Sequence, residues 1–225
     1  MRRSGAFGET QFFLRLWHGQ FSFWRMDAPM CASRELRAME LAREAGVPVT
    51  SPLRTASGVP VRGLCERPLS SAGRHGALVE FVALKCVPHA RDGRGGPVAV
   101  RPDGQKLVIE MMARLHSLSL AGRDTSPLAR FDSPLEQISY LRSTAAECDR
   151  PLLLAAVEKV ATLFEAPDAP PPLPPALLHF DYNRGNLLCD YHGQLAALID
   201  WEDAAIADSR LDVARFVLVC RHSPR

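Results

Sequence analysis

Two short apolar runs, residues 187–189 and 195–199, lie on either side of a segment made of turn-forming residues. That segment, residues 190–193, reads Asp-Tyr-His-Gly, and the whole pattern predicts a β-hairpin. A hairpin brings the outer ends of its two strands together. Asn186, just before the first strand, and Asp200, just after the second, are therefore expected to face one region of space.

A third polar residue, Asp181, lies in the loop that enters this hairpin, five positions before Asn186. Phosphoryl transfer needs a divalent ion held by oxygen ligands, and a carboxylate that orients the acceptor hydroxyl and takes its proton. We therefore expect Asn186 and Asp200 to hold Mg²⁺ and Asp181 to act as the base. His179 is expected to brace the loop through hydrogen bonds rather than to react.

The composition is that of an ordinary globular protein. The 225 residues are 47% hydrophobic and 23% charged, with a net charge of +2. So balanced a charge argues against a nucleic-acid-binding protein. No apolar run approaches the ~20 residues that a membrane helix needs, and no apolar segment follows the basic pair at the start. We expect no nucleic-acid or membrane partner.

The six cysteines lie at least 21 positions apart and form no C-x-x-C pair. Such spacing is typical of separate thiols in a reducing compartment rather than of a disulfide or zinc framework. It predicts a cytoplasmic protein.

The first half of the chain alternates strands and one helix. Residues 12–17 are aromatic and apolar enough for a strand, and residues 79–82 predict another. Between them, Ser33 is expected to cap a helix that Gly46 and Pro48 end.

The second half is predominantly helical. Asp103 is expected to cap one helix, and residues 133–136 form a capping box that begins a second. A third, residues 152–164, is apolar on more than one side and is expected to be deeply buried. Two irregular segments are predicted, a Gly-rich loop at residues 91–97 and an extended Pro-rich connector at residues 167–175.

The polar motifs resemble those of a known family. The spacing of His179, Asp181 and Asn186, followed by Asp200 and then by Asp212, closely resembles the aminoglycoside phosphotransferase and choline kinase-like family. That family has a protein-kinase-like fold. The resemblance implies that Asp212 is structural and holds the catalytic loop from the following helix.

Upstream residues extend the resemblance. Arg15 looks like the basic residue of the family's third strand, which contacts the nucleotide phosphates, and Glu35 looks like its ion-pair partner. Glu80, Phe81 and Val82 are similar to the strand and hinge that hold adenine through backbone hydrogen bonds. Such backbone contacts do not distinguish ATP from GTP.

The fold class that the resemblance implies is α+β, a protein-kinase-like two-lobed fold. Residues 1–83 would form a partial N-terminal nucleotide-binding lobe and residues 84–225 a helical catalytic lobe. Both ends are expected to be short relative to the family, which has a phosphate-covering turn before the basic strand and further helices at the C-terminus. The expected activity is transfer of the γ-phosphate of ATP, with Mg²⁺, to a hydroxyl of a small molecule.

Other interpretations remain open. Without the phosphate-covering turn the chain would be a non-catalytic kinase-like remnant, because positioning supplies most of the catalysis in this reaction. A metal-dependent hydrolase would use His179, Asp181 and Asp200 as ligands, but it would leave Asn186 without a role. Arg15 could be a surface charge on an edge strand and Glu35 a solvated helix residue; we expect His116 to be a packed helix residue rather than a ligand.

Overall fold

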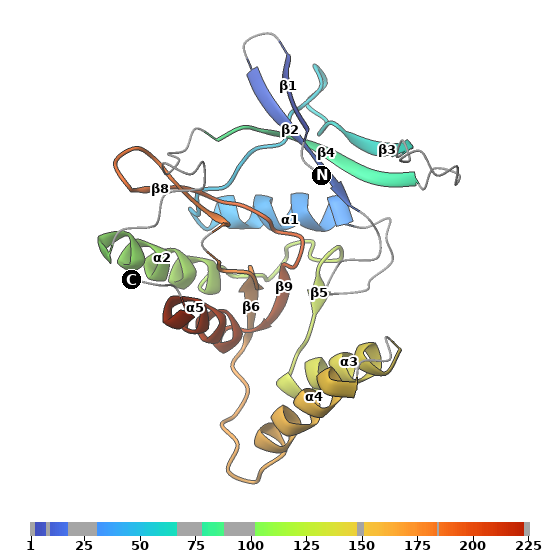
Figure 1. The fold of residues 1–225 in the computed structure, drawn as a ribbon, viewed down its shortest axis with the longest axis vertical. Coiled ribbons are helices and arrows are strands. Elements are labelled where there is room, and N and C mark those ends of the chain that lie inside the picture. The colour runs from blue at the N-terminus through green and yellow to red at the C-terminus, as the bar shows by residue number, and fades with distance from the viewer. Residues whose placement is uncertain are drawn as a thin grey trace.

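The computed structural model describes residues 3–7, 10–17, 31–66, 78–87, 102–147, 151–183 and 185–222. Its first part is an antiparallel sheet of four strands in the order β1-β2-β4-β3 (Figure 1). The strands are β1 (Arg3–Phe7), β2 (Thr10–Trp17), β3 (Arg62–Glu66) and β4 (Leu78–Lys85). The predicted strands at 12–17 and 79–82 are confirmed as parts of β2 and β4. Strand β1, which pairs with β2, was not predicted.

Helix α1 (Cys31–Glu44) lies beside this sheet (Figure 1). It ends as predicted, because Gly46 takes a φ of +75° and its N–H donates to the carbonyl of Arg43. The start differs from the prediction. Ser33 lies inside the helix rather than at its cap, and its hydroxyl accepts a hydrogen bond from Arg62.

The second part is built on two helices, α2 (Pro102–His116) and α5 (Arg210–His222), next to a three-stranded sheet in the order β5-β9-β6. The strands of that sheet are β5 (Ala129–Arg130), β6 (Pro175–Leu178) and β9 (Ala205–Asp208). The predicted buried face of α2 is confirmed at Val108, Met111, Met112 and Leu115. Because α2 begins at Pro102, Asp103 lies in its first turn and is not its cap.

The predicted hairpin is confirmed. Strands β7 (Leu187–Cys189) and β8 (Leu195–Leu198) pair antiparallel, with an irregularity between Leu188 and Cys189. The Asp190 carboxylate accepts hydrogen bonds from the N–H groups of His192 and Gln194, at 2.8 and 2.9 Å. This side chain therefore closes the turn locally.

The hairpin is also joined to the exit of α1. Val49 forms a parallel bridge with Leu198, and the N–H of Leu198 donates to the carbonyl of Pro48 at 2.8 Å. The segment that leaves the first part of the molecule is thus bonded to the second. The predicted boundary after residue 83 falls inside β4, which continues to Lys85.

Helices α3 (Pro134–Glu147) and α4 (Pro151–Phe164) pack on each other at the end of the molecule opposite the four-stranded sheet (Figure 1), and Tyr140 of α3 packs against the three-stranded sheet. The predicted capping box is confirmed: the N–H of Glu136 donates to Ser133 Oγ at 3.2 Å. The Glu136 carboxylate reaches one residue further back than expected and accepts from the N–H of Asp132.

The expectation that α4 is deeply buried is wrong. Leu152 is 87% exposed and Leu163 is 66% exposed. Among the α4 side chains that the structure describes, Val157 and Ala161 are buried, and they pack with Ile138 of α3. One neighbouring helix covers one stripe of residues, so apolar side chains outside that stripe, such as Leu152 and Leu163, stay exposed.

The Pro-rich connector is extended and exposed as predicted, and it passes into β6 at Pro175. Pro175 is the first residue of an edge strand, a position where a missing N–H is tolerated. The predicted Gly-rich loop at 91–97 lies outside the described residues. In the ranges that are described, no helix is both long and apolar enough to cross a membrane.

Candidate active site

The loop between β6 and β7 folds around the carboxylate of Asp181. The Asn186 amide nitrogen donates to the carbonyl oxygen of Asp181 at 3.0 Å and to its Oδ2 at 2.8 Å. Asn183 donates to the same Oδ2 at 2.7 Å. The N–H of Ile199 donates to the carbonyl of Asn186, so Asp200 directly follows the residue opposite Asn186. The structure thus brings the three predicted polar residues to one place.

The donor set suits a hard cation such as Mg²⁺. Asn186 uses its amide nitrogen on Asp181, and its amide oxygen accepts no hydrogen bond from the described residues. Asp200 adds a partly exposed carboxylate and holds a φ of +72°, an unusual backbone conformation for a residue with a side chain. Amide and carboxylate oxygens are the ligands that Mg²⁺ prefers in proteins.

His179 is fully buried and braces the loop through both ring nitrogens. Its Nε2 donates to the carbonyl of Ile199 at 2.9 Å, and its Nδ1 accepts from the N–H of Asp181 at 3.2 Å. Burial lowers the pKa of His179, which favours the neutral ring that these two roles require. The ring packs edge-on against Trp201, 4.6 Å away between centroids. These contacts agree with the bracing role expected for His179.

Asp212 of α5 holds the loop between β6 and β7 through hydrogen bonds to its backbone. One carboxylate oxygen accepts from the N–H of Phe180 at 2.8 Å, and the other accepts from the N–H of His179 at 3.1 Å. The second oxygen also lies 3.0 Å from Nε2 of His116, at the end of α2. The prediction treated His116 as a packed residue and missed this pair, because no sequence pattern connects two residues 96 positions apart.

Arg15 of β2 lies among three carboxylates. Its Nε is 3.9 Å from Oε2 of Glu35, and its Nη2 contacts Asp200 and lies 2.7 Å from Oε2 of Glu202. The contact with Glu35 agrees with the expected ion pair, whereas the contact with Asp200 was not predicted. Strand β2 is an inner strand and Glu35 is buried, so neither residue is a simple surface charge.

The Glu35 carboxyl group has an unusual affinity for protons. Burial raises its pKa to about 7, and the positive charge of Arg15 opposes this rise. The same cluster raises the pKa of Arg15: burial works against its charge, but Glu35, Asp200 and Glu202 outweigh that effect. Arg15 therefore stays charged between the sheet and the hairpin.

The three expected hinge residues lie in the middle of β4. Glu80, Phe81 and Val82 pair with β2 on one side and with β3 on the other. Their backbone groups are therefore engaged in the sheet and are not offered to a base, in contrast to the expectation. The strand leaves the sheet only after Lys85.

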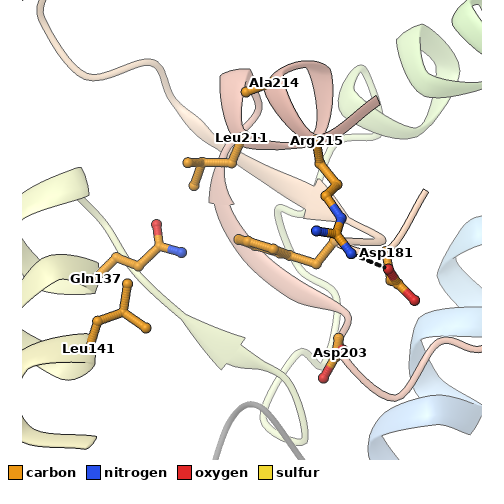
Figure 2. A pocket seen from close by; sticks show the side chains of 8 residues that line it. Gln137, Leu141, Asp181, Asp203, Leu211, Ala214 and Arg215 are labelled. Carbon is orange, nitrogen blue, oxygen red and sulfur yellow. Dashed lines mark hydrogen bonds and ion pairs between the residues drawn. The ribbon is translucent and has the colours of Figure 1, made fainter. Parts of the chain in front are cut away.

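A residue that the sequence did not single out contacts Asp181. Nη2 of Arg215, one turn beyond Asp212 on α5, donates to Oδ1 of Asp181 at 2.9 Å. Burial alone would raise the pKa of Asp181, but hydrogen bonds from Arg215 and Asn183 lower it overall. Both residues line a cavity of about 360 Å³ between α3 and α5 (Figure 2).

A small antiparallel sheet over a helical part, with a carboxylate and amide cluster between them, defines a protein-kinase-like phosphotransferase fold. The profile of the phosphotransferase enzyme family (APH) matches residues 3–225, and the chain belongs to this family. No curated protein sequence matches the chain.

Solved structures of this family share the fold at low sequence identity. The GDP complex of a mutant aminoglycoside 2'-phosphotransferase-IIIa is 18% identical with a TM-score of 0.57, covering 98% of this chain and 72% of that one. An aminoglycoside-3'-phosphotransferase of type VIII is 19% identical with a TM-score of 0.57, covering 96% and 71%. Choline kinase LicA from Streptococcus pneumoniae is 14% identical with a TM-score of 0.52, covering 99% and 66%.

Proposed function

We propose that this chain transfers the γ-phosphate of ATP to a hydroxyl group of a small molecule. The family and the fold support phosphotransfer as the reaction class. The observation that carries the proposal is the convergence of Asp181, Asn186 and Asp200 through the β7–β8 hairpin. Similar phosphotransferase structures that contain GDP, ADP or AMP support a nucleotide as the donor.

Asp181 is proposed as the base. Its Oδ2 is occupied by Asn183 and Asn186, so the carboxylate is held in one orientation. An acceptor hydroxyl would donate to Oδ1, on the side of the cavity. A carboxylate with a lowered pKa is fully ionised at neutral pH and can orient that hydroxyl and take its proton.

Asn186 and Asp200 are proposed as the ligands that hold Mg²⁺, through the amide oxygen and the carboxylate. When bound, the ion would neutralise charge on the nucleotide phosphates. Arg15, held by Glu35, would place its guanidinium group against those phosphates.

The test is thermal unfolding of the purified chain with and without ATP and Mg²⁺. At ~100 times its dissociation constant a ligand should add ~2.7 kcal/mol to the free energy of unfolding. Asp200→Ala should abolish the Mg²⁺-dependent part of the shift. The control, Asp168→Ala, removes an exposed carboxylate on the Pro-rich connector and should leave the shift intact.

Two outcomes would contradict parts of the proposal. If the shift persisted in Asp200→Ala, Asp200 would not be a metal ligand. If ATP and Mg²⁺ stabilised the chain but no hydroxyl compound were phosphorylated, the non-catalytic interpretation would be favoured instead.

A further inference from the structure

Arg215 occupies the side of Asp181 that an acceptor would approach. It follows Asp212 by three positions, so both side chains lie on the same face of α5. Asp212 fixes the loop backbone through Phe180, and Arg215 contacts the carboxylate of Asp181 in that same loop. One helix face therefore positions both the loop and the proposed base.

The cavity beside Arg215 is lined partly by apolar and partly by polar side chains (Figure 2). Its apolar lining suits the hydrocarbon body of a ligand. Its polar lining consists of Asp181, Asp203, Arg215 and the amide of Gln137. The apolar residues are Leu141, Phe180, Leu211 and Ala214.

Two carboxylates and one guanidinium group line the cavity, so an anion is favoured only at the donors that Arg215 leaves unused. Of the two carboxylates, Asp181 is paired with Arg215, and Asp203 already has an interaction partner in the protein. Arg215 is 51% exposed and uses only one nitrogen, Nη2, in its contacts with the described residues. A guanidinium group has five N–H donors in a planar fork, a geometry that matches carboxylate and phosphate groups. An ammonium group placed at the same donors would instead be repelled by the Arg215 guanidinium.

We propose that Arg215 selects the acceptor, and that the cavity takes a hydroxyl compound with an apolar body and an anionic group such as a carboxylate or a phosphate. This inference rests on the proposed function, because it takes the cavity beside Asp181 as the acceptor site. The hydroxyl lies on Asp181 and the anionic group lies on the remaining donors of Arg215. Arg215 acts as a specificity residue and also positions the base.

The experiment uses three probes that differ in one substituent. They are 4-(hydroxymethyl)benzoate, 1,4-benzenedimethanol and 4-(aminomethyl)benzyl alcohol, which are anionic, neutral and cationic at pH 7 and share one hydroxymethyl ring. Their affinities for the full chain are measured by isothermal titration, with and without ADP and Mg²⁺. We expect the carboxylate to bind at least about tenfold more tightly than the amine, since only the carboxylate can accept charge-assisted hydrogen bonds from the guanidinium group.

Variants test whether the preference for the anionic probe depends on Arg215. Arg215→Gln should reduce the ratio of the two affinities to about one, and Arg215→Lys should keep part of it because the charge remains. Arg130→Gln is the matched control, since Arg130 is an exposed arginine that pairs with Asp132, and it should leave the ratio unchanged. A circular dichroism spectrum of each variant establishes that it is folded.

Three results would overturn the proposal: equal affinities for the three probes, no binding of the carboxylate probe, or a preference for the anion that survives Arg215→Gln. The failure of the proposed function looks different. In that case ATP and Mg²⁺ would give no stabilisation, while an anion preference that depends on Arg215 would still mark the cavity as a binding site.

Discussion

The carboxylate of Asp212 accepts a hydrogen bond from the backbone N–H of Phe180 at 2.8 Å, across 32 positions of sequence. Phe180 holds a φ of +68°, a left-handed conformation that is costly for a bulky residue. The second oxygen of the carboxylate accepts from the N–H of His179. Helix α5 therefore stabilises the strained entry to the loop that carries Asp181.

Replacement of Asp212 should destabilise the fold. Asp212→Ala would remove the acceptor of the buried N–H of His179 and of the partly buried N–H of Phe180, and the loss of a buried hydrogen bond costs ~1–3 kcal/mol. We expect the free energy of unfolding to fall by about 3 kcal/mol or more, measured by urea denaturation. Asp168→Ala, on the exposed connector, should change it by less than ~0.5 kcal/mol. Equal effects of the two substitutions would contradict the fastening role.

Asp181→Asn should impair phosphate transfer without impairing nucleotide binding. The amide keeps nearly the same shape, but it cannot take the proton of an acceptor hydroxyl. We expect ATP and Mg²⁺ to stabilise the variant as they stabilise the original chain. Phosphate transfer to an acceptor should fall by ~10²–10⁴-fold. If nucleotide stabilisation were lost while turnover remained, the assignment of Asp181 as the base would be wrong.

Two valines of α4 provide a matched test of packing. Val157 is 6% exposed and contacts α3, whereas Val160 is 45% exposed. Val157→Ala should lower the free energy of unfolding by about 2 kcal/mol, because it removes buried methyl groups and leaves a cavity. Val160→Ala should cost less than ~0.5 kcal/mol, since alanine also has the higher helix propensity. Similar losses for both would mean that the outer face of α4 is covered in solution.

Gly46 ends α1 through its backbone conformation rather than through lack of space. Among the described parts of the chain, a Cβ atom at this position would meet only Arg114, at 3.8 Å, but φ is +75°. Gly46→Ala should therefore lower the free energy of unfolding by ~1–2 kcal/mol. Gly46→Asn should cost less, because asparagine tolerates the left-handed region. A harmless alanine would show that the helix ends differently in solution.

His179 should make stability depend on pH. Burial lowers its pKa below the ordinary value of 6.5, so the unfolded chain binds its proton more readily than the folded chain does. The stabilisation is present above pH 6.5 and is lost as the pH falls through the folded pKa, with a slope of up to ~1.4 kcal/mol per pH unit. Denaturation at a series of pH values should show this slope. In His179→Gln, which has no titrating ring, the slope should diminish.

Structural features that depend on residues close together in the sequence were predicted correctly. The β7–β8 hairpin follows from turn residues between two apolar runs, and the capping of α3 follows from Ser133 and Glu136. Both depend on interactions within a few positions of sequence. The same holds for the end of α1 at Gly46.

Features that depend on distant partners were missed. The exposure of α4 was missed because helical periodicity identifies apolar residues but not which of them a neighbour covers. The expected hinge at residues 80–82 failed because strand pairing with β2 and β3 takes up the backbone there. The contacts His116–Asp212 and Arg215–Asp181 join separate elements, and no local sequence pattern predicts such contacts.

The bond between Leu198 and Pro48 makes the proposed metal-binding hairpin part of the same hydrogen-bonded unit as the exit of α1. If the four-stranded sheet and α1 rotated as a body relative to α2 and α5, either β8 would have to move with them or this hydrogen bond would have to break. Closure over a nucleotide should then shift the hairpin rather than leave it fixed. In hydrogen exchange, the amides of Leu198 and Ile199 should open together with the end of α1, as one cooperative block.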